Sequence, residues 1–155
     1  MDWNNIRNSK GIRNIVSLAT STVTGSAISA IFWLYLAGLI SQEEYGELGY
    51  LLAIAGITSN IALLGGVWVM TVYTAKEKNV QPVLYLISLI SSGISAAILY
   101  VIFQNAGLSV FVIGFIIFNL ILAEIQGRKL YKNYAIFFVL QKLFFVLISL
   151  SLFQL

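Results

Sequence analysis

Two long runs of uncharged residues, separated by a short acidic segment, constrain this chain more than any other feature. The first run lies between Arg13 and Glu43, and the second lies between Glu47 and Lys76. Each run exceeds the roughly 20 apolar residues that a helix needs to cross the hydrocarbon core of a bilayer. We therefore predict two transmembrane helices joined by a tight connection that holds Glu43, Glu44 and Glu47.

The composition excludes several classes of protein. Hydrophobic residues make up 59% of the chain and charged residues only 10%, whereas about a quarter of the residues in an ordinary soluble domain are charged. The nine Lys and Arg fall in short clusters between apolar runs, so we expect no nucleic-acid partner. The chain has no cysteine and no histidine, which removes disulfides and the commonest metal ligands. We therefore expect no metal and no cofactor.

The apolar segments predict an all-α fold, a polytopic membrane protein with five transmembrane helices in a single domain, 1–155. The first segment is too long for the roughly 7 to 15 apolar residues of a signal-peptide core, so we expect it to be retained. Pro82 marks the start of the third helix, because proline suits the first helical turn. The predicted spans cover approximately 14–40, 48–73, 83–103, 108–125 and 134–155.

The positive charges outside the predicted spans lie at alternate connections, which predicts the topology. The positive-inside rule then places the N-terminus in the cytoplasm and the connections after the first and third spans outside. We expect a multi-pass protein of the cytoplasmic (inner or plasma) membrane, with membrane lipids as its immediate partners. The cations precede the first span, follow the second and follow the fourth: Arg7, Lys10, Arg13; Lys76, Lys78; Arg128, Lys129, Lys132.

Hydroxylated side chains form a stripe on the first predicted span. Ser17, Thr20, Ser21 and Thr24 follow i, i+3, i+4, i+7 spacing, so they share one helical face. Such a face either packs closely against a neighbouring helix or lines a water-filled substrate path. Both interpretations stay open from the sequence.

The second predicted span contains two features that interrupt its apolar character. Asn60 lies near its middle. Burying an unpaired amide in hydrocarbon has a free-energy cost of about several kcal/mol. We expect Asn60 to hydrogen-bond to a neighbouring helix or to line a cavity. The pair Gly65-Gly66 favours a kink or a close helix contact.

Two charged side chains lie within or at the edge of the later spans. Glu124 precedes Arg128 by four residues, so the two can pair along one helix face, or Glu124 can serve as a gate or ion-coupling group. Lys142 lies about two turns into the fifth span, where it either snorkels or pairs with a neighbouring helix, or binds an anion in a central cavity. The sequence contains no catalytic triad and no phosphate-binding glycine loop with a lysine, so we expect no enzyme.

Four short motifs resemble a known family of transporters. The chain begins with a basic Lys10–Asn14 segment, and Ile40–Gly49 contains a Glu-Glu-Tyr-Gly turn. Leu64-Gly65-Gly66 interrupts the second span, and Gln126–Tyr134, between the fourth and fifth spans, contains Gly127-Arg128 and ends on tyrosine. In these motifs the chain resembles the N-terminal part of Wzx-type polysaccharide flippases, members of the multidrug/oligosaccharidyl-lipid/polysaccharide (MATE-like) exporter superfamily.

The resemblance implies a function and a set of candidate residues. It implies part of the first helical bundle of a MATE-like exporter that flips a polyprenyl-(pyro)phosphate-linked oligosaccharide by alternating access, for cell-envelope polysaccharide biosynthesis. With five spans the chain corresponds to less than one bundle, so we expect a truncated lobe and a C-terminal lobe supplied separately. The candidate substrate-path residues are Ser17, Ser21, Thr24, Asn60, Glu124, Arg128 and Lys142.

Two other functions compete with the flippase. A multidrug or small-solute antiporter of the same superfamily requires an acidic residue deep in a span, for which Glu124 is the candidate. A non-transporting scaffold subunit requires only a packing surface. The Glu-Glu-Tyr-Gly turn favours the flippase.

The topology gives the first testable prediction. Reporter tags inserted next to Tyr45 and next to Asn105 should both be found outside the cytoplasm, because neither connection carries a cation. Protease or label accessibility in intact cells measures their side of the membrane. A cytoplasmic tag at either position contradicts the predicted threading.

Overall fold

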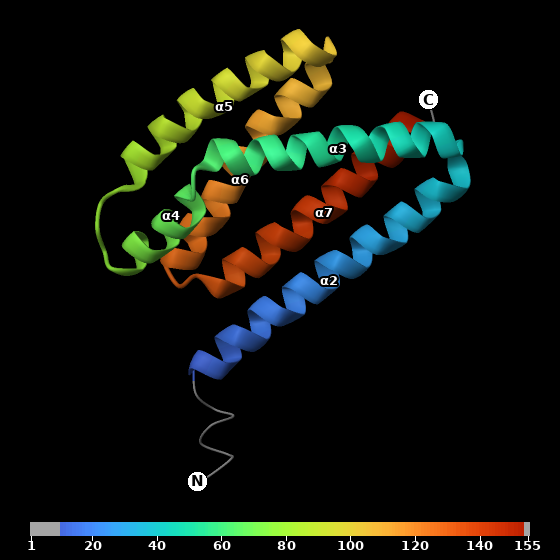
Figure 1. Ribbon diagram of the computed structural model, residues 1–155. Helices are drawn as coiled ribbons and strands as arrows, with labels where there is room; N and C mark the ends of the chain where they lie inside the picture. Colours follow the sequence, from blue (N-terminus) through green and yellow to red (C-terminus); the bar gives the residue numbers. More distant parts are fainter. Residues whose placement is uncertain (1–9, 154–155) are drawn as a thin grey trace. The chain divides into compact units, whose positions relative to one another are not determined.

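The computed structural model describes residues 10–153, and within that range all secondary structure is helical (Figure 1). The described part of the chain forms two compact units, one built by the first and last helices and one by the four between them. We call these unit 1 and unit 2. Unit 1 contains α2 (Lys10–Leu39) and α7 (Tyr131–Phe153); unit 2 contains α3 (Gln42–Leu63), α4 (Gly66–Ala75), α5 (Gln81–Phe103) and α6 (Ala106–Gly127).

Four helical segments are long and apolar enough to cross a membrane, which confirms the all-α prediction and indicates a membrane protein. The fifth predicted span coincides with α7, but several of its side chains and residues 154–155 lie outside the described residues. Five spans in a single domain therefore stay a prediction. The four segments are Asn14–Leu39, Gln42–Leu63, Gln81–Phe103 and Ala106–Gly127.

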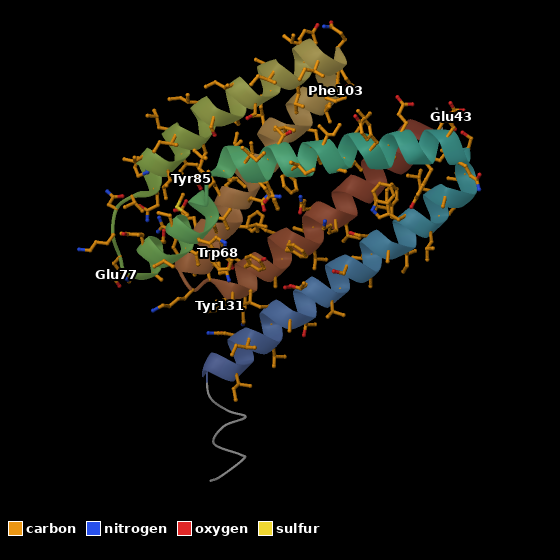
Figure 2. All side chains as sticks on the ribbon, in the orientation of Figure 1. Glu43, Trp68, Glu77, Tyr85, Phe103 and Tyr131 are labelled. Carbon is orange, nitrogen blue, oxygen red and sulfur yellow. The ribbon has the colours of Figure 1, made fainter. Side chains whose placement is uncertain are left out.

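The acidic connection is shorter than the sequence indicated, because α3 begins at Gln42. Ser41 caps this helix: its hydroxyl accepts from the backbone N–H of Glu44, and the Glu44 carboxylate accepts from the backbone N–H of Ser41 at 2.9 Å. Glu43 and Glu44 stand in the first turn, where the helix dipole favours carboxylates (Figure 2). The prediction that Glu43, Glu44 and Glu47 lie in a loop is therefore wrong.

The second predicted span, 48–73, is not one helix. The chain breaks at Leu64 and Gly65, which have left-handed backbone angles of φ 47 and φ 75. Glycine adopts such angles without steric cost, so the break falls at the predicted glycine pair. The result is a 22-residue helix, α3, followed by a 10-residue helix, α4.

Unit 2 is assembled around α6, which packs against α3, α4 and α5. The inner side of α6 carries Val112, Ile116 and Leu120, each 0% exposed. Figure 2 shows the side chains, with Tyr85 near the start of α5 and Phe103 at its end. Three of the four buried positions of α5 are small or hydroxylated, whereas its exposed positions are mostly isoleucine, leucine and valine. The buried residues of α5 are Ser88, Ser92, Ala96 and Leu99.

Two serines near the contact of α3 and α5 differ in their hydrogen bonding. The Ser91 hydroxyl donates to the backbone carbonyl of Ala62 on the neighbouring helix. Ser59 is 0% exposed, and its hydroxyl has no hydrogen-bond partner. An unpaired hydroxyl is unfavourable in an apolar core, so Ser59 is tolerated for its small size and not for a bond.

Unit 1 consists of α2 packed against α7. The two helices lie close together at Gly25, where an added Cβ would lie 2.6 Å from Cε1 of Phe138. The Phe138 ring in turn stacks on Tyr134, with centroids 5.9 Å apart. Glycine at position 25 therefore allows the aromatic side chain of α7 to reach the backbone of α2.

The contact between α4 and α6 gives a second prediction. A Cβ at Gly127 would lie 2.7 Å from Cβ of Thr74 and 2.8 Å from the backbone oxygen of Thr71, so Gly127→Ala forces the two helices apart. Overpacking of this kind costs about 1–3 kcal/mol. Gly114, on the same helix, has no atom within 4 Å of its Cβ position, so Gly114→Ala is the control.

Thermal unfolding of the detergent-solubilised protein measures both variants. Gly127→Ala should lower the midpoint, and Gly114→Ala should leave it unchanged or raise it, because alanine favours a helix by roughly 0.5–1 kcal/mol over glycine. Equal midpoints for the two variants would refute the close contact.

Candidate functional site

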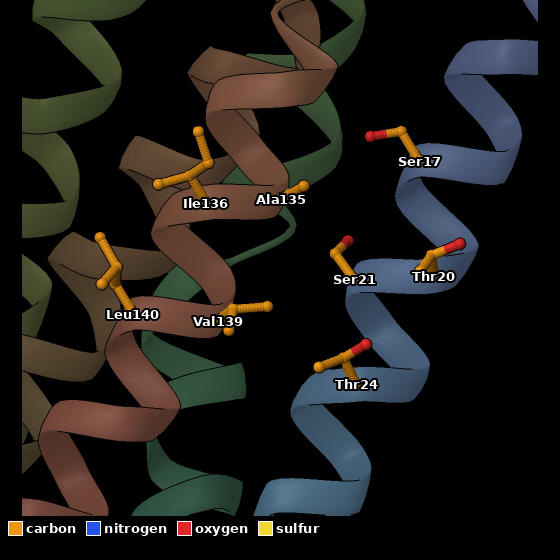
Figure 3. Close-up of a pocket in the computed structure, with 8 residues that line it drawn as sticks. All are labelled: Ser17, Thr20, Ser21, Thr24, Ala135, Ile136, Val139 and Leu140. Atoms are coloured by element: carbon orange, nitrogen blue, oxygen red, sulfur yellow. The ribbon is translucent and has the colours of Figure 1, made fainter.

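An open groove of about 540 Å³ runs along the contact of α2 and α7 in unit 1 (Figure 3). We call it the hydroxyl groove. One wall comes from the hydroxylated stripe of α2, and the other comes from aliphatic side chains of α7. The stripe predicted to share one helical face therefore does line one surface. The lining residues are Ser17, Thr20, Ser21 and Thr24 from α2, and Ala135, Ile136, Val139 and Leu140 from α7.

The hydroxyls of this groove are only partly satisfied by the protein. Ser21 is buried, and its hydroxyl donates to the backbone carbonyl of Leu18 at 2.8 Å. The hydroxyls of Ser17, Thr20 and Thr24 make no hydrogen bond to the described residues. Because an unpaired hydroxyl is costly in hydrocarbon, these three groups favour water or a polar ligand in the groove.

Lys142 borders this groove at its α2 contact. Its Cγ lies 3.5 Å from the Cβ position of Gly25, which follows the groove residue Thr24 in the chain. Its Nζ lies 5.7 Å from the ring centroid of Phe138, one turn earlier on α7. The ammonium group therefore points toward the start of α7, the end predicted to be cytoplasmic, as a snorkelling lysine does. The cation–π contact holds it there. A role in anion binding stays a prediction.

A polar cluster joins α5 and α6 in unit 2. Arg128 Nη2 lies 2.7 Å from Glu124 Oε1, which confirms the predicted ion pair. Tyr85 donates its hydroxyl proton to the other carboxylate oxygen of Glu124 at 2.8 Å. Both oxygens of Glu124 are thus engaged, which is the arrangement of a structural group. Sequence reasoning missed Tyr85. Its position one turn after Pro82 places its hydroxyl near the start of the third predicted span, at the same side of the membrane as Glu124 and Arg128.

Further hydrogen bonds draw α4 into the same region. The Gln81 side chain donates to the hydroxyl of Thr74 at 3.3 Å, and the Thr71 hydroxyl reaches the backbone oxygen of Ala123 at 3.3 Å. The ends of α4 and α6 therefore meet beside the start of α5. We call this region the basic end of unit 2, and its exposed cations are Lys76, Lys78, Arg128 and Lys129.

Asn60 does not have the predicted partner on a neighbouring helix. It is exposed on α3, and its Nδ2 donates to the backbone oxygen of Gly56, one turn earlier, at 2.9 Å. The prediction of a bond to a neighbouring helix is therefore wrong, because a side-chain amide can return to its own helix, while the cavity role of Asn60 stays a prediction. Asn119, which the sequence reasoning missed, is half-buried on α6 and bonds Phe115 in the same way at 2.7 Å.

Comparison of the chain with protein-family models, curated proteins and solved structures finds no match. Among the described residues, no three His, Cys, Asp or Glu side chains are grouped closely enough to hold a metal ion. The described features that bear on function are therefore the hydroxyl groove, Lys142 and the polar cluster of unit 2.

The polar cluster gives a third prediction. Tyr85→Phe removes one hydrogen bond to a carboxylate between α5 and α6, and should lower the free energy of unfolding by about 1 kcal/mol. Tyr100→Phe is the matched control, because Tyr100 is an exposed tyrosine on the same helix whose hydroxyl has no bond to the described residues.

Unfolding in mixed micelles provides the measurement. A double-mutant cycle with Glu124→Gln should show coupling between positions 85 and 124. If Tyr85→Phe destabilises no more than Tyr100→Phe, the bond does not hold the two helices together.

Proposed function

We propose that this chain is the N-terminal part of a Wzx-type flippase, which moves a polyprenyl-(pyro)phosphate-linked oligosaccharide across the cytoplasmic membrane. The observation that supports the proposal most is the hydroxyl groove, with Lys142 two residues after the groove residue Leu140 on α7 and its Cγ next to Gly25 of α2. The resemblance of the sequence motifs supports it independently. The proposed protein is a transporter and not an enzyme.

The chemistry of the groove suits a glycan headgroup. A sugar cannot cross about 30 Å of hydrocarbon without replacing the hydrogen bonds that it makes with water. The hydroxyls of Ser17, Thr20 and Thr24 provide replacement donors and acceptors, because they make no bond to the described residues. A single wall of hydroxyls thus lowers the cost of burying a sugar.

The two walls of the groove match the two parts of a lipid-linked sugar. Hydroxyls of α2 suit the glycan, and the aliphatic wall of α7, with Val139 and Leu140, suits a polyprenyl chain. The ammonium of Lys142 offsets the charge of the linking phosphate, because opposite charges attract strongly at low dielectric.

An oligosaccharide needs more walls than this groove supplies. Its volume of about 540 Å³ is that of a site for a small molecule. We therefore propose that the transported headgroup is enclosed by the hydroxyl groove together with further helices of a C-terminal lobe.

The antiporter receives less support from the geometry. Its coupling group, Glu124, has both carboxylate oxygens bonded, one to Arg128 and one to Tyr85. Proton or ion coupling would first have to break both contacts. A non-transporting scaffold does not account for unbonded hydroxyls that line a groove.

Removal of the groove hydroxyls tests the proposal. Thr20→Val and Thr24→Val delete a hydroxyl with little change of shape, and each should lower flux about threefold, the equivalent of one hydrogen bond of roughly 0.5–1.5 kcal/mol. Thr22→Val is the matched control, because Thr22 lies outside the groove and its hydroxyl already donates to Leu18 at 2.9 Å. Lys142→Met, which removes the ammonium group but keeps an unbranched side chain, should lower flux about tenfold or more.

Translocation of a fluorescent lipid-linked oligosaccharide is measured in membrane vesicles from cells whose own copy carries each variant. Equal abundance of the variants in the membrane is checked by immunoblot. Full flux with Lys142→Met and with the combined Thr20→Val/Thr24→Val variant would contradict the proposal.

A further inference from the structure

Unit 2 contains a second groove, formed by α5 and α6 and distinct from the hydroxyl groove. Its volume is about 390 Å³, and its lining is almost entirely apolar. We call it the acyl groove. It begins at the first turn of α5 and follows the contact with α6 for about two turns. It is lined by Pro82, Tyr85, Leu86 and Leu89 from α5 and by Ile117 and Leu120 from α6.

An apolar groove on a transmembrane helix pair has to be filled. An empty groove leaves the side chains on its walls without van der Waals partners. Lipid tails are as apolar as leucine, so an acyl chain enters such a groove at no cost in solvation, but also without selectivity. Any preference for one lipid must therefore come from the groups at the mouth of the groove.

Two contacts connect a lining residue of the acyl groove, Tyr85, with Arg128. Tyr85 lines the groove and bonds to Glu124, and Glu124 pairs with Arg128. The Arg128 side chain is 55% exposed, and its Nε and Nη2 share one carboxylate oxygen of Glu124. Its Nη1 makes no hydrogen bond to the described residues and is available to a phosphate oxygen.

The surrounding charges favour an anionic ligand. Lys76, Lys78 and Lys129 are exposed at the basic end of unit 2, together with Arg128. The carboxylates there are Glu77 and Glu124, and Glu124 is already ion-paired. Basic clusters beside transmembrane helices attract anionic headgroups in this way.

We propose that the acyl groove binds one chain of an anionic phospholipid, with the headgroup phosphate held by Arg128. The groove supplies the position of the chain, and the basic end of unit 2 supplies the preference for negative charge. The site does not depend on the proposed transport function, because the acyl groove lies on α5 and α6, whereas the hydroxyl groove and Lys142 lie on α2 and α7.

Native mass spectrometry of the full chain in detergent tests the headgroup preference. The probes are dioleoyl phosphatidylglycerol and dioleoyl phosphatidylcholine, which have the same chains. The unmodified protein should retain phosphatidylglycerol about fivefold more strongly. The combined Glu124→Gln/Arg128→Gln variant, whose net charge is unchanged, should reduce retention of phosphatidylglycerol because it removes the guanidinium that holds the phosphate, and Arg128→Lys should keep most of the retention.

A matched pair of variants tests the groove. Leu89→Trp fills it, whereas Ile90→Trp adds the same ring to an exposed position on α5 outside the groove. Leu89→Trp should reduce retention of phosphatidylglycerol about tenfold, and Ile90→Trp should not.

Photolabelling of the unmodified protein provides a measurement that is independent of any folding defect. A phosphatidylglycerol with a diazirine near the end of one chain should label peptides of α5 and α6 that contain Leu89 and Ile117. Equal retention of the two lipids, equal effects of the two tryptophan variants, or labelling spread evenly over the helices would overturn the proposal. A cross-linked dimer joined through Leu89, with no lipid label there, would assign the groove to a second copy instead.

Discussion

Transmembrane helices gain little from burying apolar side chains against one another, because the surrounding lipid is equally apolar. Close contact between backbones has to hold them together instead. This constraint explains why the buried face of α5 consists mostly of small residues while its exposed positions carry isoleucine and leucine. On α5 the buried positions include Ser88, Ser92 and Ala96, and the exposed ones include Ile94 and Ile98. On this helix the larger apolar side chains therefore lie mostly on the exposed side.

The same constraint determines where polar groups lie. In hydrocarbon a donor must find an acceptor close at hand, and the nearest is the carbonyl one turn earlier on the same helix. Ser21, Asn60 and Asn119 all use it or the carbonyl three residues back. Most of the described polar contacts between helices instead gather at the basic end of unit 2. The hydroxyl groove is the exception, since three of its hydroxyls have no bond to the described residues.

The features that the sequence predicted are local ones. The helical fold follows from long apolar runs, the break at Gly65 from the conformational freedom of glycine, and the Glu124–Arg128 pair from i, i+4 spacing. The start of α3 also depends on a local interaction, the capping box formed by Ser41 and Glu44. The sequence analysis instead interpreted these polar residues as part of a loop.

The features that the sequence could not predict join distant segments. Tyr85 and Glu124 are 39 residues apart, and Ser91 and Ala62 are 29 apart, so no spacing rule connects them. The hydroxyl stripe of α2 was predictable as a helical face, whereas its partner wall on α7 depends on how the two helices pack. Asn60 is the opposite case: we expected a hydrogen bond to a neighbouring helix, and the structure has a local one to the backbone oxygen of Gly56.

Lipid exposure of α5 tests the orientation of its two faces most directly. The chain has no cysteine, so spin labels can be placed on single introduced cysteines from position 86 to 102 in bilayers. The account predicts that collision rates with dissolved oxygen rise and fall with a helical period of about 3.6 residues. The maxima should lie at Ile90, Ile94, Ile98 and Val101, and the minima at Ser88, Ser92, Ala96 and Leu99. Uniform oxygen access, or access of a water-soluble nickel reagent at the isoleucine positions, would contradict it.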